Sequence, residues 1–209
     1  MMPPLRRGPV DISAWWLVVA FLSGFAAAMW AEELMLNWRD NHIELSAPRL
    51  HFLAGKPLER MHNAVDVPFN FHVTLYSGER SHVFRQVWDR FVVSYDVWDE
   101  TFHVVKLQEP RKMVSHLTAQ AAEAWCWQQM PMDVSGLNNS ELFWAKVDIR
   151  AEDTKGSPLF RGGAITDSGF SLTSLIELFS RPPDSGQTHW TLDAGPYTLD
   201  DLRRSHGRG

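Results

Sequence analysis

The nine histidines are the residues of this chain whose type most invites a chemical role, since imidazole both binds metals and exchanges protons. Their positions are His42, His51, His62, His72, His82, His103, His116, His189 and His206. No two lie within five residues of each other, so the sequence has no local pair of metal ligands. A hairpin would bring His72 towards His82, with His103 on the next strand, and three such side chains could bind zinc. The interpretation that the pattern favours is a solvated face of a sheet.

A second set of candidate ligands is acidic and borders a glycine-rich segment over residues 151–169. The set is Asp148, Glu152, Asp153 and Asp167. Calcium binds carboxylate oxygens of this kind, but the spacing does not match the twelve-residue helix–loop–helix pattern. A solvated turn is the interpretation that the spacing favours. We therefore predict no metal and no cofactor.

Candidate nucleophiles are equally weak in this sequence. Cys126 is the only cysteine, which excludes an intrachain disulfide, and it lies in a helix-forming run over residues 121–127 that favours a buried structural thiol. Ser168-Gly169-Phe170-Ser171 is not the Gly-x-Ser-x-Gly nucleophile elbow, and no phosphate-binding glycine loop occurs. We assign no catalytic residue. An enzymatic role stays uncertain, with the pattern favouring a non-enzymatic one.

Ten tryptophans are many for a chain of 209 residues. Most are expected to be core and hairpin side chains, while an aromatic binding face or a belt near a membrane is the alternative. We single out four of them as a possible ligand or partner surface. They are Trp88, Trp98, Trp125 and Trp144.

The first 31 residues indicate the compartment. Arg6 and Arg7 precede an uncharged, largely apolar run over residues 12–31 that ends in small residues, which is typical of a secretory signal peptide. A run of about 20 residues is also just long enough to be an uncleaved membrane anchor, and a buried soluble helix is the third possibility. With a signal or an anchor, the rest of the chain is extracytoplasmic, periplasmic or in the cell envelope. A net charge of −5 argues against nucleic acid as a partner.

Alternating apolar residues predict a sheet. Residues 65–76 are apolar at every odd position, which predicts a strand whose start lies at a sheet edge because of Pro68. Residues 82–94 change phase, which a bulge or two buried faces would explain. Further strands are predicted over residues 43–53, 101–107 and 143–150.

Two segments change to a helical period. Ser115 to Met130 predicts a helix with Ser115 as its N-cap, and residues 171–180 predict a short late helix docked on the sheet. The fold class is therefore mainly β (α+β), an antiparallel sandwich or strongly curved sheet with one middle and one late helix packed on it. The predicted division is 1–31 signal or anchor, 40–183 β-rich extracytoplasmic domain, and 184–209 a partly disordered C-terminal tail.

Several segments in order give the chain a family resemblance. They are the strand 65–71, the hairpin 88–105 with Ser94-Tyr95-Asp96, the helix 117–127, and the segments 143–153 and 168–173. In this order they resemble an uncharacterised bacterial envelope family classed as a domain of unknown function. The resemblance implies an exported β-rich domain and supplies no catalytic residues.

Three functions follow as hypotheses. The first is a non-enzymatic extracytoplasmic module that binds an envelope protein partner or supports a membrane complex, with contact to the membrane through the N-terminal segment if it is uncleaved. The second is a small-ligand carrier or sensor with a cavity between sheet and helix, which the four tryptophans would line. The third is an exported metal-dependent hydrolase that uses His72 and His103.

Overall fold

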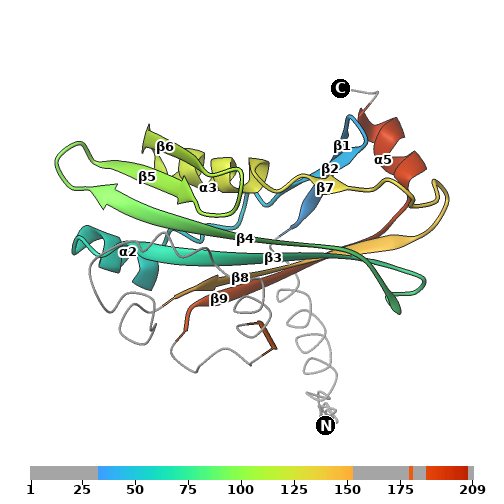
Figure 1. Ribbon diagram of the computed structural model, residues 1–209, viewed down its shortest axis with the longest axis horizontal. Coiled ribbons are helices and arrows are strands. Elements are labelled where there is room, and N and C mark those ends of the chain that lie inside the picture. The colour runs from blue at the N-terminus through green and yellow to red at the C-terminus, as the bar shows by residue number, and fades with distance from the viewer. Residues whose placement is uncertain (1–32, 153–178, 181–186, 207–209) are drawn as a thin grey trace, which may run out of the picture. The chain divides into compact units, whose positions relative to one another are not determined.

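A long antiparallel sheet of six strands dominates the chain, with the order β6-β5-β4-β3-β8-β9 (Figure 1). We describe a computed structural model, and the described residues are 33–152, 179–180 and 187–206. The strands are β3 (Val67–Ser77), β4 (His82–Asp96), β5 (Thr101–Lys106), β6 (Lys112–Leu117), β8 (Phe143–Ala151) and β9 (His189–Tyr197). The predicted signal or anchor lies outside the described residues, as does most of the predicted late helix. Within the described residues, no helix has the length and apolar character needed to cross a membrane.

The alternation of the sequence separates the two faces of this sheet. In β8 the odd residues Phe143, Ala145, Val147 and Ile149 are all fully buried, while the even residues between them are half-buried. A strand places successive side chains on opposite faces, so the odd positions form the inner face. The predicted inward set of this strand is confirmed.

The position of Pro68 corrects one expectation. β3 is an inner strand that pairs with both β4 and β8, so its start is not at a sheet edge. The main-chain N–H of Glu152 donates to the carbonyl of Pro68 at 2.9 Å, just beyond the last register pair with β8. The nitrogen of Pro68, which has no hydrogen to donate, lies on the same side of the strand as this carbonyl. It therefore faces the end of β8, where the hydrogen-bond ladder stops.

A bulge accounts for the phase change in β4. The register with β3 passes from Leu75 opposite Arg85 to Tyr76 opposite Val83, which leaves Phe84 as the extra residue. Because the extra residue interrupts the period of two, residues beyond the bulge lie on the opposite face from the one that uninterrupted alternation would give them. A bulge is one of the two explanations that the sequence left open, and the structure has it at Phe84.

A second, three-stranded sheet has the order β1-β2-β7, with β1 (Met35–Arg39), β2 (His42–Ser46) and β7 (Met132–Asp133). Strand β2 overlaps the predicted strand over 43–53 but begins one residue earlier and ends at Ser46, and β1 was not predicted.

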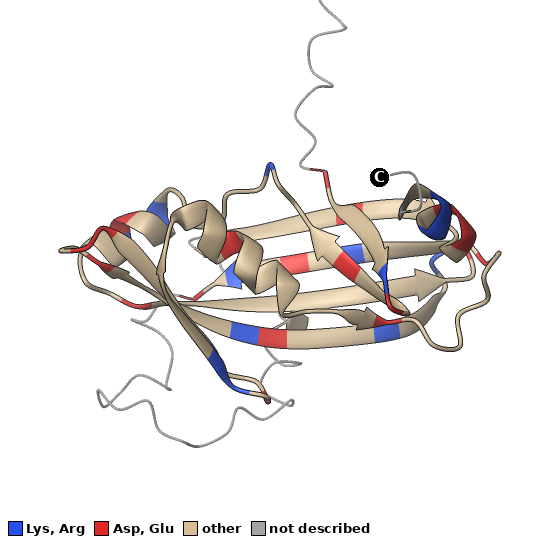
Figure 2. Cartoon of the chain, turned by 90° about the horizontal axis from the view of Figure 1, so that it is seen from above, with Lys and Arg blue, Asp and Glu red and all other residues tan. Residues whose placement is uncertain are grey.

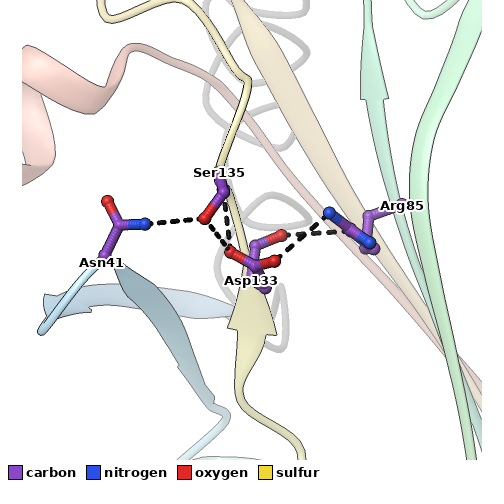
Figure 3. A network of polar contacts seen from close by, with 4 residues as sticks. All are labelled: Asn41, Arg85, Asp133 and Ser135. Carbon is purple, nitrogen blue, oxygen red and sulfur yellow. Dashed lines mark hydrogen bonds and ion pairs between the residues drawn. The ribbon is translucent and has the colours of Figure 1, made fainter.

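A polar network ties this small sheet to β4 (Figure 3). Arg85 donates through Nε to the Asp133 carbonyl at 3.2 Å and approaches the Asp133 carboxylate at 3.4 Å. Ser135 donates to that carboxylate at 2.6 Å and accepts from Asn41 at 2.8 Å. The main-chain N–H of Ser135 donates to the same carboxylate at 2.9 Å. The two hydrogen bonds that Ser135 donates, followed by the charge of Arg85, lower the pKa of Asp133.

The middle helix α3 (Ala119–Gln128) begins later than the sequence predicted. Residues up to Leu117 form strand β6, and the N-cap is Thr118, whose hydroxyl accepts from the Ala121 N–H at 3.2 Å. Ser115 is therefore not the cap. Helix α3 packs against β2 and β5, so it joins the two sheets (Figure 1).

The C-terminal residues also differ from the expected partly disordered tail. Strand β9 completes the large sheet beside β8, and helix α5 (Leu199–His206) packs on β1. Arg203 of this helix lies over the ring of Trp38 at 4.4 Å. A short helix, α2 (Lys56–His62), contacts β3 and β4. The mainly β (α+β) fold class is confirmed, with two antiparallel sheets and helices packed on them.

Candidate functional site

The four tryptophans predicted as a surface do not gather in one place. Trp88 and Trp144 lie on the outer face of the large sheet, where they are opposite His72 and Tyr76 of β3, four register positions apart. Trp125 is half-buried on α3, 6.1 Å from the ring of Phe91. Trp98 lies at the turn between β4 and β5.

Trp98 is the most exposed large apolar side chain among the described residues, with 95% of its surface accessible. Its neighbour Val97 is 54% exposed. The turn that carries them is fixed by Asp96, whose carboxylate accepts from the main-chain N–H groups of Trp98 at 2.8 Å and of Asp99 at 3.2 Å. An aspartate that bonds to the backbone two residues on is a stable turn device. The hairpin therefore holds an exposed indole on an ordered support.

The surroundings of this hairpin tip are acidic. Asp96 and Asp99 belong to the tip, with Glu100 closing the turn, and acidic bands mark that end in Figure 2. The two main-chain hydrogen bonds lower the pKa of Asp96, and the nearby His103 and His116 lower it slightly further. The tip therefore combines an exposed apolar side chain with three acidic residues, of which Asp99 lies 3.8 Å from His116.

A second aromatic cluster lies in the middle of the outer sheet face. The ring of His72 stacks on Trp88 with centroids 3.5 Å apart, and Phe179 packs on both rings at 5.2 and 5.0 Å. The guanidinium of Arg150 lies 4.6 Å from the Phe179 ring. Phe179 and Ser180 are the only described residues of the predicted late helix over 171–180, and the rest of that helix lies outside the described residues.

His72 is held neutral in this cluster. Burial lowers its pKa to about 4, with the charges of Lys146 and Arg150 acting in the same direction and that of Asp148 opposing them. A folded pKa below the ordinary value means that the unfolded chain takes up a proton first as the pH falls. Stability that is present above about pH 6.5 is therefore lost towards pH 4.

We expect a His72→Phe variant, which keeps a ring against Trp88, to lose this pH dependence. The wild type should lose about 1 kcal/mol relative to the variant between pH 7 and pH 4, a value reduced for the partial exposure of the ring. Urea unfolding of both chains across that range measures the difference. Parallel stability curves for the two chains would contradict the assignment of a neutral, partly buried imidazole.

A pocket of about 250 Å³ lies between β2, the turn that follows it, and one face of α3. Its helical wall is formed by residues spaced three or four apart, as one face of a helix requires. Trp127 and Glu123 are buried in this wall, whereas Gln120, Ala124 and Gln128 are exposed around them. The pocket thus has a buried floor and an exposed rim.

Glu123 holds the turn after β2 against α3. Its Oε1 accepts from the Leu53 N–H at 2.8 Å, and its Oε2 lies 3.1 Å from Nδ1 of His51. The Glu123 side chain is 7% exposed, while the His51 side chain is 59% exposed. A nearly buried carboxylate needs partners of this kind, so Glu123 both shapes the pocket and satisfies its own charge.

A buried ion pair lies on the inner face of the large sheet. Lys106 Nζ of β5 is 3.1 Å from the carboxylate of Asp89 on β4, and both residues are nearly buried. Burial raises the pKa of Asp89 to about 6, although the charge and hydrogen bond of Lys106 pull it down. The nearby thiol of Cys126 is fully buried, and burial followed by the charges of Asp89 and Glu123 raises its pKa. A thiol in such surroundings is protonated and unreactive.

The structure does not bring together the histidines that the sequence offered as candidate zinc ligands. His72 stacks on Trp88, His82 is opposite Ser77 at the other end of the hairpin, and His103 lies on β5 opposite Ser94. In the part of the chain that the structure describes, no group of three His, Cys, Asp or Glu side chains is placed to hold a metal ion.

The two described carboxylates among the acidic candidate ligands already have partners. Asp148 accepts from the Thr191 hydroxyl at 2.7 Å, and Glu152 accepts from Asn70 and Arg90 at 2.8 and 2.5 Å. Asp153 and Asp167 lie outside the described residues.

The floor of the pocket is the feature that sequence reasoning missed. Glu123 and Trp127 differ by four positions, so they lie on one face of α3, and no pattern in the sequence marked that face as the buried one. The partners of Glu123 are Leu53 and His51, which are 70 and 72 residues away along the chain, so no local pattern could reveal them.

Comparisons of the chain with family models, with curated proteins and with solved structures found no match. The resemblance to an envelope family of unknown function therefore stays a prediction.

Proposed function

We propose that this chain is a non-enzymatic extracytoplasmic module of the bacterial envelope that binds a protein partner through the tip of the β4–β5 hairpin. The observation that carries the proposal is the 95% exposure of Trp98 on a turn fixed by Asp96. The extracytoplasmic location rests on the signal or anchor pattern of residues 1–31.

An ordered, exposed tryptophan is suited to binding. Tryptophan is among the residues that contribute most to protein interfaces, because one side chain buries a large apolar area. The hydrogen bonds to Asp96 fix the turn before binding, so less conformational entropy is lost on association. Val97 extends the apolar area beside the indole.

The charge around the tip defines the partner. Asp96, Asp99 and Glu100 would repel an anionic lipid surface, which attracts basic segments. A protein pocket that accepts the indole and carries basic residues around its rim complements the tip in both shape and charge. A protein partner is therefore favoured over direct contact with lipid.

A photo-crosslinking amino acid at position 98 of the full chain tests this function in the bacterium that encodes it. We expect one protein adduct of defined mass after illumination of intact cells, and we expect the adduct to contain an envelope protein. The same amino acid at Leu142 is the matched control. That residue is 48% exposed, and it lies just before β8 rather than at the β4–β5 turn.

Two further results would decide against the proposal. The first is a set of adducts at position 98 that equals the set at position 142, because it would mean nonspecific contact. The second is an adduct with lipid alone, because it would assign the tip to the membrane surface. The proposal also requires that Trp98→Ala reduces co-purification of the partner without lowering the thermal unfolding temperature.

A further inference from the structure

Two histidines lie beside the acidic tip of the β4–β5 hairpin. His103 of β5 and His116 of β6 have ring centroids 5.5 Å apart. Nε2 of His116 is 3.8 Å from the carboxylate of Asp99 in the turn, and both of these side chains are largely exposed. Imidazole gains or loses its positive charge between about pH 5 and 8. The tip therefore carries groups whose charge changes close to neutral pH.

A β-bulge sets the position of His116. The register between β5 and β6 shifts by one residue between Phe102 and Val104, where His103 is opposite two residues of β6, Ser115 and His116. The φ angle of His116 is 59°, in the left-handed region that residues other than glycine seldom adopt. Bulges re-aim side chains. This one brings the His116 ring within reach of both the neighbouring imidazole and the turn.

The charges at the tip itself are negative. They belong to Asp96 at the end of β4 and to Asp99 and Glu100 in the turn. The charges of both histidines act on Asp96, in the direction that lowers its pKa, so histidines and carboxylates form one electrostatic cluster. Protonation of both imidazoles offsets two of the three carboxylates and leaves one net negative charge.

The next charged residues along these strands lie beside the β5–β6 loop, at the far end from the tip. They are Arg90 of β4, Lys106, Glu109, Arg111 and Lys112. Arg90 is bonded to Glu152, and Lys106 is paired with Asp89.

The helices that pack near these strands place their charges elsewhere. Helix α2 carries Lys56, Glu59, Arg60 and His62. The His62 ring packs on Tyr95 at 4.6 Å, and Tyr95 pairs with Phe102, on the opposite face of the sheet from His103. Glu123, the one charged residue of α3, is bonded to His51. In the described part of these elements, the charges beside the two imidazoles are therefore those of the acidic tip.

We propose that His103 and His116 make protein binding by the hairpin tip sensitive to pH, so that the partner is released as the pH falls from about 7.5 to about 5.5. This inference rests on the proposed function of the tip. A partner with basic residues around its pocket is attracted by the carboxylates. Each imidazolium weakens that attraction and repels the basic residues directly.

The charge of the tip can be measured without the partner, in the purified full-length Trp98→Cys chain. The new thiol is treated with a cationic methanethiosulfonate, the trimethylammonium-ethyl reagent, and with an anionic one, the sulfonatoethyl reagent. Cys126 is fully buried and does not contribute. The ratio of the two rates cancels the fraction of thiolate. We expect the cationic-to-anionic ratio to fall about fourfold from pH 7.5 to pH 5.5 at low salt, and to change little at about 1 M salt.

Histidine variants in the same chain assign this change. The pair His103→Gln and His116→Asn should abolish it, and asparagine is chosen because it tolerates a positive φ. His82→Gln is the matched control, since His82 is exposed at the other end of β4 and should not affect the ratio. Thermal unfolding verifies that each variant is folded.

Photo-crosslinking at position 98 in intact cells then measures release of the partner. The adduct yield should fall about threefold or more from pH 7.5 to pH 5.5, and by less than about twofold when both histidines are replaced. A reagent ratio that does not change with pH, or equal adduct yields at the two pH values, overturns the inference and leaves the protein-binding function standing. If no adduct forms at either pH, the proposed function itself fails, whatever the reagent ratio.

Discussion

Replacing Lys106 by methionine should destabilise the chain by about 3–5 kcal/mol at pH 8, because it leaves the Asp89 carboxylate buried without its partner. The two side chains are 9% and 3% exposed and lie 3.1 Å apart on the inner face of the large sheet. Removing one partner of a buried ion pair destabilises a protein by far more than the intact pair stabilises it. Urea unfolding of the full chain measures the loss.

The pH dependence of this variant is part of the prediction. The folded pKa of Asp89 is about 6, above its ordinary value, so the contribution of this carboxyl group to stability is greatest below its ordinary pKa and is lost as the pH rises through 6. Lys106 holds that pKa down, so in Lys106→Met it rises further and the loss extends to higher pH. At pH 5 the carboxyl group is protonated in the variant, and the destabilisation should shrink markedly.

The double variant Asp89→Val, Lys106→Met is the control. It removes both charges and fills the site with apolar side chains, so its stability should lie within about 1 kcal/mol of the wild type or exceed it. If Lys106→Met alone were as stable as the wild type at pH 8, the pair would not be buried as described.

Phe71→Ala should cost about 3–5 kcal/mol, the usual loss for truncating a buried phenylalanine. Phe71 is fully buried at the centre of β3, with ring centroids 5.4 Å from Phe52, 5.2 Å from Phe91 and 5.6 Å from Trp127. One ring therefore joins the turn after β2, the neighbouring strand and α3. Thermal unfolding should show a single transition at a lower temperature.

Phe84→Ala is the matched comparison for this variant. Phe84 is a half-buried residue at the bulge of β4, so its truncation should cost only about 1 kcal/mol. Equal losses in the two variants would contradict the position of Phe71 at the centre of the core.

The alternating strands were predictable because period two is written directly in the sequence. Residues 65–76 and 143–150 gave the right inner faces, although Asn70 and Thr74 on the opposite face of 65–76 are buried as well. The phase change in 82–94 left a bulge and two buried faces as alternatives, and the structure has a bulge. Strand β9 alternates less clearly, since Gly195 and Pro196 interrupt its end. Its place beside β8 depends on long-range pairing, which local composition does not reveal.

The candidate sites were less predictable for the same reason. Trp98 lies in a turn whose residues are typical of a connection between strands, and the sequence analysis named Trp98 as a candidate surface residue. The pocket instead needs Glu123 to meet residues 51 and 53 across the fold. The same holds for Asp89 and Lys106, which become partners only once β4 and β5 pair.

Cysteine labelling at position 98 tests most directly whether the hairpin tip is presented outside the cytoplasm. Cys126, the only natural cysteine, is fully buried, so the wild-type chain provides an unlabelled background. In a Trp98→Cys chain, we predict that a membrane-impermeant maleimide modifies the new thiol in intact cells. Labelling that occurs only after the cells are permeabilised would contradict the account, since the tip would then face the cytoplasm.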